Sequence, residues 1–387
     1  MVLLLFYLLA ITALLIGTAA IYMALIEVFP VKWLYYHYFI RKPINWTIFS
    51  VLLIWTFVIF IQVNQFPYWA LVPVIISLLA LILSYKMHQE NAFKAVDFPE
   101  FARDVSDLPL KDEMELAIIE YHGITKCYPL DYVIHHHIIN DKFGSRIVAL
   151  TYCAMCRSII PFDVTEIGPL FVGSFKGANM IVADRKTKTF FQQATFKSII
   201  GKLHPYELKM IPFQILNWTE VKKVISKPLV VKVVAKDFRE FQLPIPGIWK
   251  RIVVTEKTPG LSAKNRDHSF PSRTPVIGIL DTSIKESLVY LKKDVIANRL
   301  ILNENDSFFL LGVGNTVNGF KTVVNNTSLE VGIENDEIID RITGTQWNIR
   351  GKYLKGSLNV DLDPIAISDE YWFSWKKFHK NSKLISL

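Results

Sequence analysis

Cysteine is scarce in this chain, which has three in 387 residues: Cys127, Cys153 and Cys156. Three cysteines do not make the disulfide framework of a small secreted domain, and the odd number leaves Cys127 over even if the close pair is oxidised. The sequence also lacks an HExxH motif, a nucleophile elbow and a protein-kinase signature. The run GVGNTVNG at 312–319 has the wrong spacing for a phosphate loop and no lysine. No common enzyme class is therefore indicated by a motif.

Charge is also sparse, at 20% of residues against 51% hydrophobic ones. The net charge of +8 is compatible with a nearby anionic membrane surface. The basic residues are nevertheless dispersed among 35 acidic ones, so the composition does not indicate nucleic-acid binding.

Long apolar runs are present at the N-terminal end, at 2–29, 46–63 and 69–85. At about 1.5 Å per residue the first exceeds the roughly 30 Å hydrocarbon thickness of a bilayer, and it lacks the basic start of a signal peptide. The other two are separated by NQFPY and flanked by Trp and Tyr, as expected of a hairpin. We predict a membrane domain over 1–88 with three transmembrane helices, and the lipid bilayer as a partner.

Orientation follows from the segment 30–45, predicted as a loop. It holds Lys32, Arg41 and Lys42, whereas the hairpin tip holds no charge. The positive-inside rule then places this loop and the C-terminal body in the cytoplasm. We therefore expect a multi-pass integral membrane protein. No feature identifies a protein partner or a small ligand.

Beyond a polar linker at 89–114, the chain breaks into short β-branched runs bounded by turn residues. Examples are RIVALTY at 146–152, PLVVKVVA at 228–235, RIVVTEK at 251–257 and SFFLLGVG at 307–314. This pattern predicts a mainly antiparallel β body with a few short helices, an α+β fold.

The body also repeats itself. Asp184-Arg185-x-Thr187 before Phe191 matches Asp340-Arg341-x-Thr343 before Trp347, and Trp218 and Trp375 follow at similar distances. We predict two duplicated halves, 115–235 and 270–387, joined by a connector at 236–269. Because both halves carry the Asp-Arg-x-Thr turn, a shared structural task is the first interpretation. A pair of anion-binding sites is the alternative.

The segment TYCAMCRSIIPFD at 151–163 holds Cys153 and Cys156, and the second half has no cysteine at the matching place. Two intervening residues allow both sulfurs to reach one point, which suits a reversible disulfide or two ligands of a soft metal. Further metal ligands would come from HHHIIND at 135–141, and two thiolates with an imidazole suit zinc or copper. The third interpretation is two buried cysteines packing as small apolar residues.

The order and spacing of these segments resemble the domain of unknown function 3179 family over roughly 115–385. The positions that match the family's motifs are His137, Asn140, Asp141, Cys153, Cys156, Asp184, Arg185, Thr187 and Gln193. The resemblance makes His137 the first choice as a third metal ligand, and it implies an exported body, contrary to the positive-inside rule. Ala154 stands where the family usually has proline, and Phe191 where it tends to have Trp. The family name supplies no reaction.

Two classes of function remain open at this stage. The first is a membrane-tethered thiol-redox or metal-handling protein centred on Cys153, Cys156 and His137. The second is a non-catalytic binding or assembly module in which the cysteine pair is purely structural. The sequence does not decide whether the protein is an enzyme.

Overall fold

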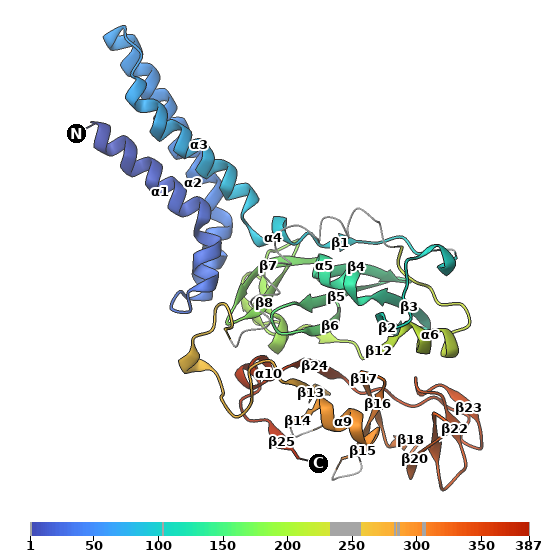
Figure 1. Cartoon of the computed structure of the whole chain (residues 1–387). Helices are drawn as coiled ribbons and strands as arrows, with labels where there is room; N and C mark the ends of the chain where they lie inside the picture. Colours follow the sequence, from blue (N-terminus) through green and yellow to red (C-terminus); the bar gives the residue numbers. More distant parts are fainter. Residues whose placement is uncertain are drawn as a thin grey trace.

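The computed structural model describes residues 2–102, 104–232, 257–281, 284, 287–303 and 307–386. Three long helices project from a strand-rich body (Figure 1): α1 Val2–Leu25, α2 Val31–Val63 and α3 Leu71–Lys86, the last preceded by the short η1 Tyr68–Ala70. In the described part of the chain these three are long and apolar enough to cross a membrane. The predicted N-terminal helices are therefore confirmed.

The segment 30–45 was wrongly predicted as a loop. It belongs to α2, which runs through Pro43 without a break. Leu34, His37 and Arg41 recur at helical spacing and are buried against the neighbouring helices. The Arg41 Nε donates to the Ser84 carbonyl at 3.0 Å. Because Arg41 is enclosed within the bundle, it does not count as a loop charge in the positive-inside argument.

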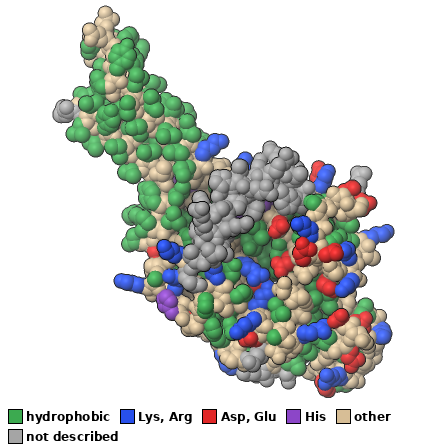
Figure 2. Space-filling model, in the orientation of Figure 1, with side chains coloured by type: hydrophobic (Ala, Val, Ile, Leu, Met, Phe, Trp, Pro, Cys, Tyr) green, Lys and Arg blue, Asp and Glu red, His purple; other side chains and the backbone are tan. Residues whose placement is uncertain are grey.

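Small residues allow α1 and α3 to pack closely. A Cβ on Gly17 would lie 2.5 Å from the Ala80 carbonyl oxygen, so only glycine fits at this contact. Ala13 and Ala20 lie on the same buried face of α1. Such faces are typical of helices that associate within lipid. The outer surfaces of the three helices are covered by hydrophobic side chains, whereas the body carries interspersed charges (Figure 2).

This arrangement predicts that the α2–α3 tip and the body lie on opposite sides of the bilayer. Single cysteines placed at the exposed Gln65, Val28 and Lys202 would be probed with a membrane-impermeant maleimide in sealed vesicles. We expect Val28→Cys and Lys202→Cys to react from one side and Gln65→Cys from the other. Labelling of all three from the same side would contradict three membrane crossings. The three native cysteines are replaced by serine in the background, so that only the introduced cysteine can react.

The first part of the body contains three sheets. They are β1-β4-β5-β6-β11, β10-β9-β8-β7 and β12-β2-β3. The strands are β1 Val96–Asp97, β2 Glu115–Tyr121, β3 Ile124–Pro129, β4 Ile138–Phe143, β5 Arg146–Cys153, β6 Ser158–Asp163, β7 Leu170–Lys176, β8 Asn179–Asp184, β9 Phe190–Gln192, β10 Ser198–Ile200, β11 Lys209–Met210 and β12 Gln214–Asn217. Short helices α4 Gln89–Ala92, η2 Val105–Asp107, α5 Leu130–His136, η3 Gln193–Thr195 and α6 Trp218–Val224 connect or cover them.

The second part lies on the far side of the first from the membrane helices (Figure 1). Its sheets are β24-β13-β14-β25, β15-β16-β17, β18-β19 and β20-β21-β22-β23. The elements are η4 Ala263–Asn265, β13 Pro275–Ile279, β14 Leu288–Leu291, α9 Lys292–Asn298, β15 Leu300–Leu302, β16 Phe308–Val313, β17 Thr316–Lys321, β18 Val323–Val324, β19 Thr327–Ser328, β20 Val331–Glu334, β21 Glu337–Asp340, β22 Gln346–Trp347, β23 Tyr353–Lys355, β24 Ile367–Tyr371, α10 Trp372–Phe378 and β25 Lys383–Ile385.

The mainly antiparallel α+β body is thereby confirmed: among the named strands of the described ranges, only β1–β4 and β14–β25 pair in parallel. The predicted strand at 251–257 falls outside the described residues except for Lys257, as does most of the predicted connector 236–269. The other boundaries that we predicted between segments stay predictions.

The two Asp-Arg-x-Thr turns have the same local structure. Asp184 ends β8 and Asp340 ends β21. Each carboxylate accepts a hydrogen bond from the hydroxyl of the threonine three residues on, Thr187 or Thr343, at 2.6 Å. Such bonds satisfy turn donors and fix the turn.

The strands after these turns also agree in register. Phe191 lies opposite Val182, and Trp347 lies opposite Ile338. Val182 and Ile338 each lie two residues before the aspartate of the turn. Further on, Gly201 and Gly356 adopt φ of 129° and 121°, each against the backbone of the threonine that precedes β9 or β22. These agreements support the duplication, which for the complete halves stays a prediction.

One aligned pair does not correspond. Trp218 is the first residue of α6, but the first residue of α10 is Trp372, and Trp375 lies one helical turn further on. We had paired Trp218 with Trp375 because they lie at similar distances from Asp184 and Asp340. Small differences in the lengths of the intervening strands and turns are enough to shift the true counterpart by three positions.

Candidate functional site

Cys153 ends β5, and Cys156 lies in the turn before β6. Cys153 pairs with Ser158 across this hairpin. The two cysteines are 2% and 0% exposed and belong to a core that also contains Met180 and, from the second half, Phe373. Both are free thiols. The turn therefore holds both sulfurs beneath the surface of the body.

Polar groups surround the Cys156 sulfur. The Asn179 Nδ2 donates to it at 3.1 Å, and the thiol lies 3.5 Å from the Ala178 carbonyl oxygen, to which it donates. Burial raises the pKa of the Cys156 thiol, and the adjacent Cys153 raises it further. Cys156 therefore keeps its proton more firmly than a free thiol does.

Cys153 is shifted in the opposite direction. Burial opposes its ionisation, but hydrogen bonds from the Cys156 thiol and from the backbone N–H groups of Cys156, Met180 and Met155 outweigh burial and lower the pKa of Cys153. Donors aimed at a sulfur stabilise its thiolate. The two thiols of the pair therefore differ: the pKa of Cys153 is lowered, and the pKa of Cys156 is raised.

Gln193 joins the cysteine pair to a buried polar network. Its Nε2 donates to the Thr151 hydroxyl at 3.0 Å, and its Oε1 accepts from Ser158 at 3.0 Å and from Asn179 at 3.4 Å. Gln193 was among the positions that match the family's motifs, whereas the sequence analysis missed Asn179. The residues around Asn179, KGAN before an apolar strand, read as an ordinary hairpin turn.

His137 does not complete a metal site with this pair. It is the cap residue that follows α5, with φ of 61°, and its ring stacks on Phe93 at 4.2 Å between centroids. Burial lowers the pKa of His137 to about 4. Over the described ranges, no group of three or more His, Cys, Asp or Glu side chains could hold a metal ion. The predicted zinc or copper site at Cys153, Cys156 and His137 gains no support from this geometry.

Asp141 lies in an ion pair of its own. Its Oδ2 accepts from Lys126 Nζ at 2.7 Å and from the Tyr128 hydroxyl at 2.6 Å, and both Asp141 and Lys126 are buried. The contact joins β4 to β3. We infer a structural role for Asp141.

Asn140 and Arg185 meet at a second structural contact. The Asn140 amide donates to Asp97 at 2.7 Å and exchanges two hydrogen bonds with the backbone of Leu170. Arg185 pairs with the same Asp97 at 3.0 Å, and Arg341 lies 3.9 Å from Glu330. Since both turn arginines face carboxylates, the structural interpretation of these turns is favoured over anion binding.

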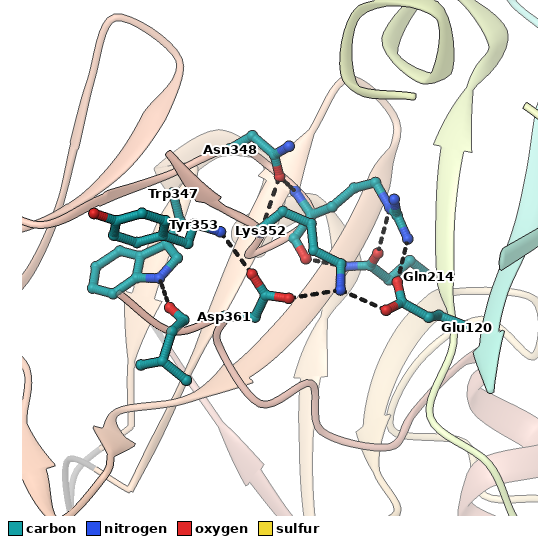
Figure 3. Close-up of polar contacts among 9 residues, drawn as sticks. Glu120, Gln214, Trp347, Asn348, Lys352, Tyr353 and Asp361 are labelled. Carbon is teal, nitrogen blue, oxygen red and sulfur yellow. Dashed lines mark hydrogen bonds and ion pairs between the residues drawn. The ribbon is translucent and has the colours of Figure 1, made fainter. Parts of the chain in front are cut away.

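The two halves meet through charged contacts. In Figure 3, Glu120 and Gln214 of the first half face Lys352 of the second. Glu120 binds Arg350 at 2.9 Å and Lys352 at 2.6 Å, and Arg350 Nε donates to Gln214 at 3.2 Å. Closer to the cysteines, the Tyr371 N–H donates to the Cys156 carbonyl at 2.9 Å. The half without cysteines thus forms one wall of the cysteine site.

The first N-terminal helix, α1, contacts the turn beside this site. Lys176 Nζ donates to the carbonyls of Met23 and Ile26 at 2.8 and 2.7 Å, which caps the C-terminal end of α1. Lys176 begins the turn that continues to Ala178 and Asn179, the partners of Cys156. One short turn therefore contacts both α1 and the thiol pair.

Comparison with known families identifies the body. The model described as protein of unknown function (DUF3179) matches residues 90–382, which is more than half of the chain. The chain belongs to the DUF3179 family. The match begins after the three N-terminal helices, and it includes every candidate residue discussed above. No curated protein and no solved structure matches this DUF3179 protein.

Proposed function

We propose that this protein is a membrane-anchored thiol–disulfide protein in which Cys153 and Cys156 alternate between dithiol and disulfide. The observation that carries the proposal is the polar setting of the buried pair: the Asn179 Nδ2 donates to the Cys156 sulfur at 3.1 Å, and the pKa of Cys153 is lowered by its neighbouring thiol and backbone N–H groups. A purely packed cysteine pair needs neither these donors nor the Asn179 amide.

The reaction uses a small oxidant such as a low-molecular-weight disulfide. The Cys153 thiolate attacks one sulfur of that disulfide and expels the other as a thiolate, which forms a mixed disulfide. Cys156 then loses its proton and displaces the remaining half. In total, two thiols lose two electrons and two protons, one S–S bond forms, and the oxidant is reduced to two thiols. Ala154 and Met155, which lie between the two cysteines, are only partly buried. We propose that a small oxidant reaches the sulfurs at this turn.

The test is a redox titration of the full chain in detergent with glutathione buffers, read by mass spectrometry after alkylation. We expect one two-electron transition in the parent, its loss in Cys153→Ser and Cys156→Ser, and its retention in Cys127→Ser. Cys127 is an apt control because it is equally buried, and burial raises its pKa to about 12. A pair that stays reduced in the most oxidising buffer would contradict the proposal.

A non-catalytic binding role is the second candidate, and a separate observation favours it. A cavity of about 400 Å³ lies at the junction of the halves and is lined by Tyr152 and Arg157, the residues that flank the cysteine pair. This volume falls in the range of small-molecule sites.

A further inference from the structure

One wall of the cavity at the junction of the halves is apolar. Leu130 of α5, Tyr152 and Ile159 of the cysteine hairpin, and Ile215 of β12 line it, and all four are buried. Apolar walls of this kind bind the hydrocarbon part of a ligand by removing it from water. A ring or a short alkyl chain would therefore be held here.

Carboxylates outnumber the basic groups around the cavity. Glu113, Glu115 and Asp131 line it from the first half, and Asp369 lines it from β24 of the second, against Lys111 and Arg157 on the basic side. Because like charges repel and opposite charges attract at short range, this lining disfavours an anion and favours a cation.

When Lys292, which binds Asp369, is counted as well, the imbalance narrows to four carboxylates against three basic groups. Arg157 lies 3.3 Å from Asp369 Oδ2, and Lys292 binds the same oxygen at 2.5 Å, so the charge of Arg157 is already engaged. Asp369 is 9% exposed, and its Oδ1 has no hydrogen-bond partner among the described residues. A buried carboxylate oxygen without a donor is costly, and a ligand N–H would satisfy it.

We propose that this cavity binds a small organic cation, a primary ammonium carried on an aromatic or short aliphatic stem. The stem lies on the apolar wall formed by Leu130, Tyr152, Ile159 and Ile215. The ammonium lies among the carboxylates of Glu115, Asp131 and Asp369. The site does not depend on the chemistry of the thiols, although Tyr152 and Arg157 place it beside them.

Three isosteric probes test the charge preference: benzylamine, benzyl alcohol and benzoate, titrated calorimetrically into the full chain in detergent. We expect benzylamine to bind at least tenfold more tightly than either of the other two. Equal binding of benzyl alcohol would overturn the ammonium assignment, and tighter binding of benzoate would reverse it.

The double variant Glu115→Gln, Asp131→Asn tests the location. We expect at least a tenfold loss of benzylamine affinity, because both changes keep the side-chain shape and remove the charge. The matched control is Glu207→Gln with Glu334→Gln, two exposed carboxylates away from the cavity, which should leave the affinity unchanged. Equal losses in both double variants would overturn the site. Cys153→Ser separates this proposal from the thiol proposal, since it abolishes disulfide formation and leaves benzylamine binding intact.

Discussion

Replacing Asp141 by alanine is expected to lower the free energy of unfolding of the body by about 3–5 kcal/mol, because Lys126 would keep its charge in a buried place without its partner. The Tyr128 hydroxyl would lose its acceptor as well. Chemical denaturation of the detergent-solubilised chain, followed by tryptophan fluorescence, measures this loss.

The matched control for this change is Asp112→Ala. Asp112 pairs with Lys222 at 2.6 Å, but both side chains are largely exposed, at 70% and 47%. Exposed pairs contribute about 0–1 kcal/mol, so this variant should unfold nearly as the parent does. A stable Asp141→Ala protein that loses disulfide cycling would contradict the structural role and make Asp141 part of the functional site.

Asp141 shows what a sequence can and cannot predict in this protein. The segment HHHIIND placed Asp141 near a candidate site. Its partners Lys126 and Tyr128 lie on another strand, β3 of the β2–β3 hairpin, whereas Asp141 lies on β4. When strand pairing brings two residues together, no pattern in the sequence identifies them as partners. The long apolar N-terminal helices and the Asp-Arg-x-Thr turns were predictable because apolar length and local turn chemistry depend on consecutive residues.

Two features could not be predicted from the sequence because they depend on tertiary contacts: the start of α2 at Val31 and the surroundings of the two cysteines. Pro43 and three basic residues are typical of a loop, but α2 runs through Pro43, and Arg41 is buried against α3. The cysteine spacing predicted that the two sulfurs meet. It did not predict that Asn179 and the second half enclose them, because those contacts join residues 23 to more than 200 positions apart.

The contact between the halves contains a buried acid whose protonation should control stability. Glu370 is 2% exposed, and burial raises its pKa to about 7, with neighbouring Asp369 adding to the shift and the Ser368 hydroxyl, which donates to Glu370 at 3.0 Å, opposing it. The charge of Glu370 in turn raises the pKa of Cys156. Ionising Glu370 therefore disfavours both the junction of the halves and the Cys156 thiolate.

The sign of the effect follows from proton binding. Below about pH 4.5 both the folded and the unfolded chain carry the Glu370 proton. Between pH 4.5 and 7 the unfolded chain loses this proton while the folded chain keeps it, so stability falls as the pH rises. At about 1.4 kcal/mol per pH unit, the loss reaches about 3 kcal/mol and levels off above pH 7.

Glu370→Gln is accordingly expected to stabilise the protein at pH 8 by up to about 3 kcal/mol, because the amide stays neutral and can still accept from the Ser368 hydroxyl. In the parent, the denaturation midpoint should fall between pH 4.5 and 8 because Glu370 ionises. In Glu370→Gln, this part of the decrease should be absent. Glu330→Gln, an exposed carboxylate of the same half, should follow the parent. If the denaturation midpoints of Glu370→Gln and of the parent change with pH in the same way over this range, the pKa of Glu370 is not raised in the folded protein. That result would contradict the proposed effect of Glu370 on stability.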